Sequence, residues 1–127
     1  AYRPIINDSA DAGVLLESRM RHLDREHFCV VLLSANNAVI GIETISIGTL
    51  TNTPVHPREV FKPAIRQSAS AVVLAHNHPS GDCMPSDEDI YLTERLVEAG
   101  QIIGIHVIDH IIVGEDRYYS FSDNELL

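Results

Sequence analysis

The sequence predicts a single α/β domain built around a mixed β-sheet. The chain has 127 residues and is 45% hydrophobic, which is enough for one compact domain with one core and too little for two. Segments with helical apolar spacing alternate with short, strongly apolar segments, in the order helix, two strands, helix, strand, helix, two strands. We therefore treat residues 1–127 as one domain.

The first half of the chain predicts a helix followed by a hairpin. Residues 7–9 (Asn-Asp-Ser) offer capping side chains, and apolar residues follow at close to helical spacing as far as Leu23. Residues 28–33 (FCVVLL) are continuously apolar, which is typical of a strand buried on both faces. A turn at residues 36–37 (Asn-Asn) leads into a second strand over residues 39–47, so the two strands form a hairpin.

The middle of the chain predicts a second helix and a buried strand. Residues 48–54 are irregular, and Pro57 then suits the first turn of a helix that continues to Ala69. Residues 71–76 (AVVLAH) form a strand with no exposed position.

The last part predicts a third helix and two more strands. Ser86 caps a helix that ends near Gly100, because glycine often follows the last helical turn. A long strand covers residues 101–113, a turn covers residues 114–116, and a final strand covers residues 117–121.

Charge and cysteine content restrict the function and the compartment. Nine basic and eighteen acidic residues give a net charge of -9, so the surface repels nucleic-acid phosphates and anionic membranes, and we expect no direct DNA binding by this domain. Cys29 and Cys83 cannot form a disulfide framework, and we find no membrane-spanning run and no signal peptide, so we expect a cytoplasmic protein. Because the chain opens on Ala1, almost directly in a capped helix, we expect a domain cut from a longer protein.

Two histidines and one aspartate form a candidate metal site. His76 and His78 lie two apart at the end of a predicted strand, so their side chains leave the same face while Asn77 points away. The following loop turns back into the helix that Ser86 opens, and Asp89 falls in its first turn. Two imidazoles and one carboxylate, with a fourth position left to water, are typical of a catalytic zinc site, although iron and cobalt also suit these ligands.

A hydrolytic zinc site needs two further groups. Zinc lowers the pKa of its bound water, but attack on a carbonyl still requires a general base and a partner for the oxyanion. A carboxylate from elsewhere in the chain could be the base, and the Ser86 hydroxyl could stabilise the oxyanion. Ser86 and Asp89 are also well explained as a capping box, and the two interpretations do not exclude each other.

Other polar residues have weaker claims. A thiolate at Cys83 could compete for zinc, but a small loop residue needs no such role. Strict alternation puts His106 and His110 on one face of their strand and Asp109 on the other, as in a half-buried polar strand. His110 could also orient a metal ligand.

The motif around these residues resembles a known family signature. His76-x-His78-Pro, six residues, then Ser86-x-x-Asp89 resembles the JAMM signature of the JAB1/MPN/Mov34 metalloenzymes, and longer motifs resemble the bacterial RadC proteins within that group. These motifs are residues 25–28 (REHF), 41–50 (GIETISIGTL), 56–61 (HPREVF), 75–81 (AHNHPSG) and 109–110 (DH). The resemblance implies an MPN fold, related to cytidine deaminases, with a curved mixed sheet flanked by about three helices. It also implies an N-terminal helix-hairpin-helix region in the intact protein.

The resemblance assigns roles to residues. His76, His78 and Asp89 match the family's zinc ligands, and Ser86 matches its oxyanion-stabilising serine. Glu26 matches its general base, and Glu43 is the second candidate for that role. Alternatively, Glu26 is an ordinary solvent-exposed residue without a catalytic role.

The function that the resemblance implies is zinc-dependent hydrolysis of an amide or isopeptide bond in a protein or peptide. The alternative is a non-catalytic MPN interaction module in a DNA repair or recombination assembly, and the RadC label implies such an association in either case. An exposed edge strand could pair with an extended peptide or with a second copy of the chain, so a homo-oligomer is a further expectation.

Overall fold

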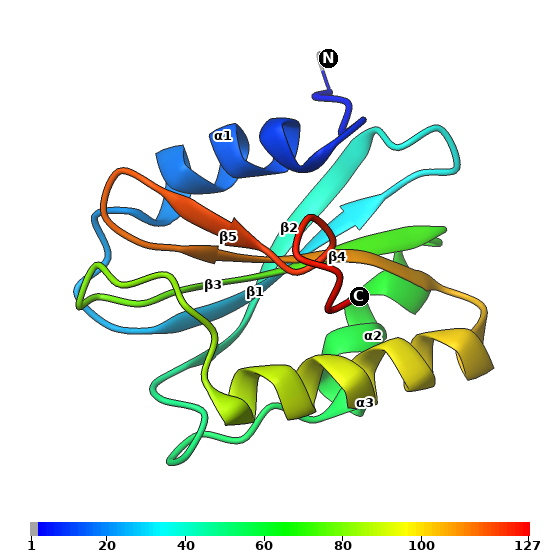
Figure 1. The fold of residues 1–127 in the computed structure, drawn as a ribbon. Coiled ribbons are helices and arrows are strands. Elements are labelled where there is room, and N and C mark those ends of the chain that lie inside the picture. Colours follow the sequence, from blue (N-terminus) through cyan, green and yellow to red (C-terminus); the bar gives the residue numbers. More distant parts are fainter. Residues whose placement is uncertain (1–2) are drawn as a thin grey trace.

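The structure of the protein is a computed structural model, which describes residues 3–127. Three helices and five strands follow one another in the predicted order (Figure 1). They are α1 (Ser9–Met20), β1 (His27–Leu33), β2 (Val39–Ile47), α2 (Pro57–Arg66), β3 (Ala71–Asn77), α3 (Asp87–Ile103), β4 (His106–Val113) and β5 (Tyr118–Ser120).

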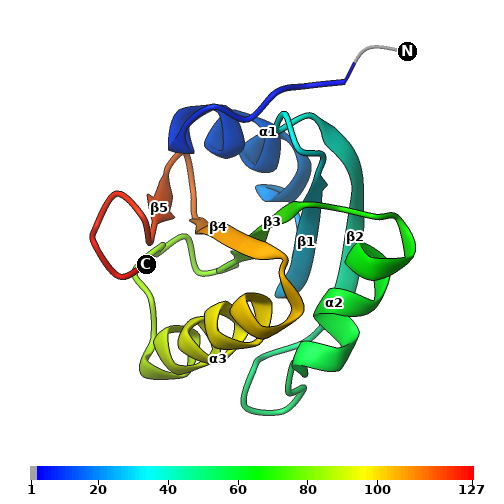
Figure 2. The same cartoon turned by 90° about the vertical axis from the view of Figure 1, so that its right-hand side faces the viewer.

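The five strands form one open sheet in the order β2-β1-β3-β4-β5. Strand β1 is antiparallel to both β2 and β3, β3 is parallel to β4, and β4 is antiparallel to β5. Helix α1 covers one face of the sheet, and α2 and α3 cover the other (Figure 2). The predicted α/β class with a mixed sheet and three flanking helices is therefore confirmed.

Both faces of the central strands are buried, as their unbroken apolar sequences predict. In β1, Phe28, Val30 and Leu32 belong to the core beneath α2 and α3, whereas Cys29 and the residues alternating with it belong to the core beneath α1. In β3, Leu74 faces α2 and α3 in the same way. Because side chains alternate along β3, the side chain of His76 also points toward α3.

The predicted boundary between the third helix and the long strand is wrong. Helix α3 continues through Gly100 to Ile103, ends at Gly104 in the left-handed conformation (φ 86°), and β4 begins only at His106. Gly100 lies inside the helix. A glycine is needed there because a Cβ would collide with the carbonyl oxygen of Ile105, just after the helix. The glycine therefore permits a close approach and is not a terminator.

Two other elements are shorter than predicted. Helix α2 ends at Arg66 and not at Ala69, because Ser68 takes a left-handed conformation (φ 57°) and the Ala69 N–H donates to the carbonyl of Ala64. The last strand is confined to Tyr118–Ser120.

The prediction that His106 and His110 share a face is also wrong. A β-bulge shifts the register of β4 against β3, so that His106 pairs with Ala71 and His110 pairs with Leu74. Ala71 belongs to the core beneath α1 and Leu74 to the core beneath α2 and α3. Paired residues of neighbouring strands point the same way, so the two histidines lie on opposite faces.

Candidate metal centre

The polar cluster of predicted ligands comes from two elements: His76 and His78 lie at and just after the end of β3, and Asp89 lies in the first turn of α3. Figure 1 shows the loop that joins these two elements. His76 continues the run of β3 side chains that face α3, and its ring stacks on Phe28 of the neighbouring strand. Asp89 is the third residue of α3 and is buried. The parallel β3–α3–β4 connection therefore brings the end of the strand and the first turn of the helix to one place.

His76, His78 and Asp89 converge so closely that they could hold a metal ion. The two Nε2 atoms are 3.0 Å apart. Asp89 Oδ1 lies 3.2 Å from Nε2 of His76, and Oδ2 lies 3.3 Å from Nε2 of His78. All three ligand atoms lie within 4.8 Å of one another. His76 and Asp89 are buried, whereas His78 is partly exposed, so the group opens to solvent on the side of His78.

The hydrogen bonds of His78 leave its Nε2 available to a cation. Its Nδ1 lies 2.8 Å from the carbonyl oxygen of Asp82. A carbonyl oxygen can only accept a hydrogen bond, so Nδ1 carries the proton and the Nε2 of the neutral ring carries a lone pair. That lone pair faces the carboxylate of Asp89, and an arrangement of acceptors around one point suits a metal ion.

The electrostatics of the cluster also fit a cation. Burial by itself would raise the pKa of Asp89, but the rings of His76 and His78 beside the carboxylate outweigh it and hold the pKa well below the usual range. The hydrogen bond to Asp89 raises the pKa of His78, although partial burial opposes the shift. In the metal-free protein a proton on His78 can therefore balance Asp89, and a metal ion competes with that proton.

Glu26 lies beside this group and Glu43 does not. Glu26 immediately precedes β1, and its Oε1 is 4.0 Å from Nε2 of His78. Glu43 pairs with Val30 in the middle of β1 and lines a separate hollow between β2 and α2, together with Lys62.

Asn77 holds the segment that carries Glu26, a contact that sequence reasoning missed. Its Oδ1 accepts from the His27 N–H at 2.7 Å, and its Nδ2 donates to the Arg25 carbonyl at 3.0 Å. The Gly48 N–H donates to the carbonyl of Glu26 at 2.8 Å. The backbone is thus fixed on both sides of the carboxylate. The only signal in the sequence is that Asn77 points away from its histidine neighbours, which does not say what it meets.

Ser86 forms the predicted capping box. Its Oγ accepts from the Asp89 N–H at 3.1 Å, and Asp89 Oδ2 accepts from the Ser86 N–H at 2.8 Å. The same carboxylate therefore caps α3 and faces the two histidines. Within residues 3–127 no hydrogen bond uses the hydroxyl proton of Ser86, whose side chain is at an exposed position.

Cys83 lies apart from the cluster. It is buried against Ile112 and Phe121, and the metal-binding group found among the described residues does not include it. Its placement fits a small side chain in an apolar position.

Thr93 and His110 lie directly behind His76. His110 is fully buried, and its Nε2 is 2.8 Å from Nδ1 of His76. Its Nδ1 is 2.6 Å from the hydroxyl of Thr93, which in turn donates to the carbonyl of Asp89 at 2.7 Å. Burial, together with the neighbouring His76, lowers the pKa of His110 well below its ordinary value, so the ring is neutral. Sequence reasoning found His110 but missed Thr93, which has no distinguishing motif.

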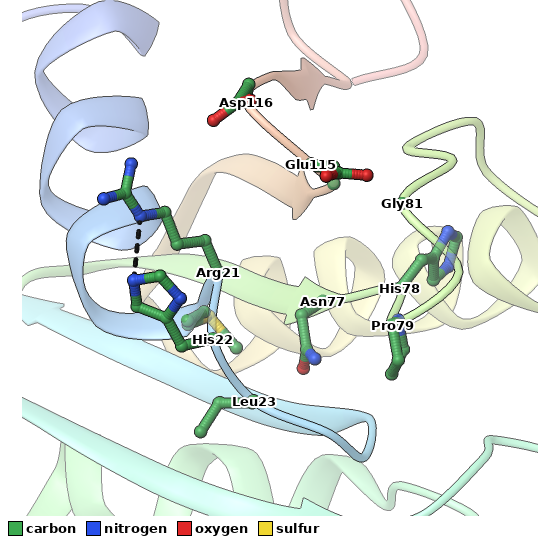
Figure 3. A pocket seen from close by; sticks show the side chains of 11 residues that line it. Arg21, His22, Leu23, Asn77, His78, Pro79, Gly81, Glu115 and Asp116 are labelled. Carbon is green, nitrogen blue, oxygen red and sulfur yellow. Dashed lines mark hydrogen bonds between the residues drawn. The ribbon is translucent and has the colours of Figure 1, made fainter.

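Two hollows meet at His78 and Pro79. One, of about 700 Å³, is lined by the Asp24–Glu26 segment, the loop after β2 and Met84. The other, of about 460 Å³, is lined by residues 20–23, Asn77 and the turn at residues 114–116. Figure 3 shows Arg21 and His22 on one side of this second hollow, His78 and Pro79 on the other, and Asp116 above it.

Among residues 3–127 no helix is both long and apolar enough to cross a membrane.

Comparison with known proteins agrees with the geometry. The family model described as RadC-like JAB domain matches residues 6–126. UPF0758 proteins of Rubrobacter xylanophilus and Desulfitobacterium hafniense are 59% and 54% identical over 125 residues, covering 98% of this chain and 55% of each relative. A UPF0758 protein of Symbiobacterium thermophilum is 60% identical over 112 residues, covering 88% of this chain and 48% of the relative. The chain thus spans about half the length of these curated relatives, and it belongs to the RadC-like JAB domain family.

Proposed function

We propose that the chain is a zinc-dependent hydrolase that cleaves an amide or isopeptide bond. The observation that carries the proposal is the convergence of two imidazole nitrogens and one buried carboxylate within 4.8 Å. Zinc prefers such ligands, and a site with three protein ligands keeps a coordination position for catalysis. His76, His78 and Asp89 are the residues that would hold the ion.

The surrounding side chains divide the remaining work. A zinc ion at this position supplies a Lewis acid that polarises a carbonyl and acidifies water. Glu26, whose Oε1 lies 4.0 Å from His78 Nε2, would take a proton from the attacking water and pass it to the leaving amine. Ser86 keeps a hydroxyl proton that it can donate to the developing oxyanion while its oxygen caps α3.

We propose a protein or peptide as the substrate. The two hollows that share His78 and Pro79 in their linings leave room for residues around a scissile bond. The net charge of -9 argues against direct contact with DNA by this domain. A DNA-repair association would then act through protein contacts. A cytoplasmic localisation fits the two free cysteines. Association of copies of the chain into a homo-oligomer is a separate prediction.

The first test measures bound metal. We expect mass spectrometry to find one zinc per chain in the purified protein, and His78→Ala to lose it. If the wild type holds no zinc even after zinc is added back, the hydrolase proposal is wrong. A non-catalytic interaction module then becomes the leading function.

The second test measures hydrolysis of a peptide library by the zinc-loaded protein. Glu26→Gln should keep its zinc and lose about 100- to 10,000-fold in rate, the usual contribution of a general base. Asp24→Asn removes a carboxylate from the same hollow and is the matched control, with activity expected to stay near wild type. Equal activity of Glu26→Gln and Asp24→Asn would exclude Glu26 as the base.

A further inference from the structure

A continuous chain of hydrogen bonds runs behind the proposed metal ligands. It links the carbonyl of Asp89, the hydroxyl of Thr93, the ring of His110 and the ring of His76, with successive separations of 2.7, 2.6 and 2.8 Å. Thr93, His110 and His76 are all buried, so water does not compete for these contacts. Each polar side-chain atom in this series of hydrogen bonds must therefore find its partner within the series.

The positions of the protons follow from the first link. The hydroxyl oxygen of Thr93 and the carbonyl oxygen of Asp89 are 2.7 Å apart, which requires a proton between them, and only the hydroxyl has one. Thr93 has then no proton left for His110. It must accept from the Nδ1 of His110, which is therefore protonated.

The position of the proton on His76 follows from that on His110. His110 is fully buried against the rings of Phe28 and Phe121, where a charged ring is unfavourable. With its proton on Nδ1, the ring has a lone pair on Nε2, which lies 2.8 Å from Nδ1 of His76. The Nδ1 of His76 must donate there, so in the neutral ring the Nε2 of His76 is the atom without a proton. That Nε2 is the atom that faces Asp89 and His78.

We infer that Thr93 and His110 are positioning residues that fix the tautomer of His76, so that its Nε2 lone pair is presented to the metal. The tautomer of His78 is fixed separately, by the hydrogen bond from its Nδ1 to the Asp82 carbonyl, and does not depend on Thr93 or His110. The two ligands are thus oriented by independent contacts. The opposite tautomer of His76 would place a proton on Nε2 and block coordination. The inference deepens the proposed metal site and rests on it only for its consequence for zinc binding.

The direct test is nitrogen-15 NMR of the histidine side chains in the metal-free chain, at a pH where the rings are neutral. We expect protons on Nδ1 of His76, His78 and His110 in the wild type. Thr93→Val removes the acceptor and keeps the shape, so His110 and His76 should shift toward the Nε2-protonated form while His78 stays unchanged as the internal control. Thr93→Ser retains the hydroxyl and should restore the wild-type pattern.

A second variant tests the other link. His110→Phe keeps an aromatic ring between Phe28 and Phe121, whose rings lie 5.7 and 4.5 Å from that of His110, but removes the acceptor for His76. It should change the tautomer of His76 alone. Competition with a chromophoric chelator should show zinc binding weakened about 10- to 100-fold in Thr93→Val and His110→Phe, the usual effect of losing such a contact, and unchanged in Thr93→Ser.

The outcomes separate this inference from the proposed function. A proton on Nε2 of His76 in the wild type, or wild-type tautomers and zinc affinity in both Thr93→Val and His110→Phe, would overturn the inference. A wild type that binds no zinc sinks the hydrolase proposal, yet the tautomers of the metal-free protein remain measurable and still decide the inference.

Discussion

Asn77 stands between two histidines in the sequence but acts on the opposite side of β3. It holds the backbone on both sides of Glu26 through the His27 N–H and the Arg25 carbonyl. A residue whose side chain hydrogen-bonds to neither histidine of the proposed metal site can therefore fix the position of the proposed base. At the scale of single residues, the site consists as much of such supports as of the groups that do chemistry.

The role of Asn77 can be measured separately from metal binding. Asn77→Ala removes both hydrogen bonds, so Glu26 should lose its fixed position, and kcat for a peptide substrate should fall about 10- to 100-fold. Zinc content should stay at the wild-type level. Asn52→Ala, at an exposed position in the hollow that Glu26 lines, is the control and should leave kcat unchanged. Loss of zinc together with activity in Asn77→Ala would show that the residue supports the ligands and not Glu26.

Asp109 makes stability depend on pH. Burial raises the pKa of Asp109, although its carboxylate accepts hydrogen bonds from the His110 N–H, the Ser120 hydroxyl and the Ser122 N–H. The folded chain then binds this proton more tightly than the unfolded chain does. The contribution to stability is complete below the ordinary aspartate pKa, near 4, and it is lost as the pH rises through the raised value.

Asp109→Asn should remove this dependence, because an amide keeps an acceptor for the two N–H groups and does not ionise. The free energy of unfolding of the wild type, minus that of Asp109→Asn, should fall as the pH rises through the acid range and level off above it. Asp116→Asn, which replaces an exposed carboxylate in the turn before β5, is the control variant measured in the same way. Denaturant titrations at several pH values measure both differences, and a flat difference for Asp109→Asn would contradict the assignment.

Single residues differ in how far the sequence reveals them. The spacing of His76 and His78 and the first-turn place of Asp89 predict a shared site, because alternation in a strand and the turn into a helix are local geometry. Glu26 carries no local signal and came from family resemblance alone. Asn77 and Thr93 could not be predicted, since their partners are set by the register of β1 and β4 against β3 and not by neighbours in the sequence.

The first turn of α3 is the element in which structure and proposed chemistry coincide. Ser86 caps the helix, and Asp89 returns the cap while facing the two histidines. Replacing Ser86 therefore confuses two effects unless the substitutions separate them. Ser86→Ala should lower the free energy of unfolding by about 1 kcal/mol, whereas Ser86→Gly should cost only a few tenths, because glycine is tolerated at this position.

Both substitutions remove the hydroxyl. If Ser86 donates to the oxyanion, both should lose about 100- to 1,000-fold in kcat despite their different stabilities. Asp8→Ala removes the matching cap of α1, where the side chain accepts from the Asp11 N–H at 2.9 Å, and should lower stability without changing kcat. Wild-type kcat in Ser86→Gly would leave Ser86 as a helix cap and nothing more.

Elements were predicted well where the pattern is local and poorly where the chain returns on itself. The continuous apolar runs of β1 and β3 predict strands buried on both faces, and they are. Gly100 predicted a helix end because glycine commonly follows a last turn, but here it makes room for the carbonyl of Ile105. The bulge that separates His106 from His110 likewise depends on the pairing of β4 with β3.

At the scale of the whole molecule, the acidic surface complicates any metal measurement. With a net charge of -9, the chain attracts divalent cations without a specific site, and screening alone can stabilise a protein that repels itself. The proposed site differs in its chemistry, because imidazole ligands favour zinc and carboxylate surfaces favour harder ions such as Mg²⁺. Comparing the two cations separates the site from the surface.

Zinc should therefore stabilise the fold through the site, and Mg²⁺ only through screening. At a free zinc concentration of about 100 times Kd, the free energy of unfolding should rise by up to about 2.7 kcal/mol. The gain should be smaller in practice, because the unfolded chain offers seven histidines and two cysteines to the same ion. His78→Ala should lose the zinc-dependent gain, while Mg²⁺ at the same concentration should shift the wild type and His78→Ala equally in thermal denaturation. Equal stabilisation of both proteins by zinc would mean that the ion binds the acidic surface, because only a site built from His78 responds to its removal.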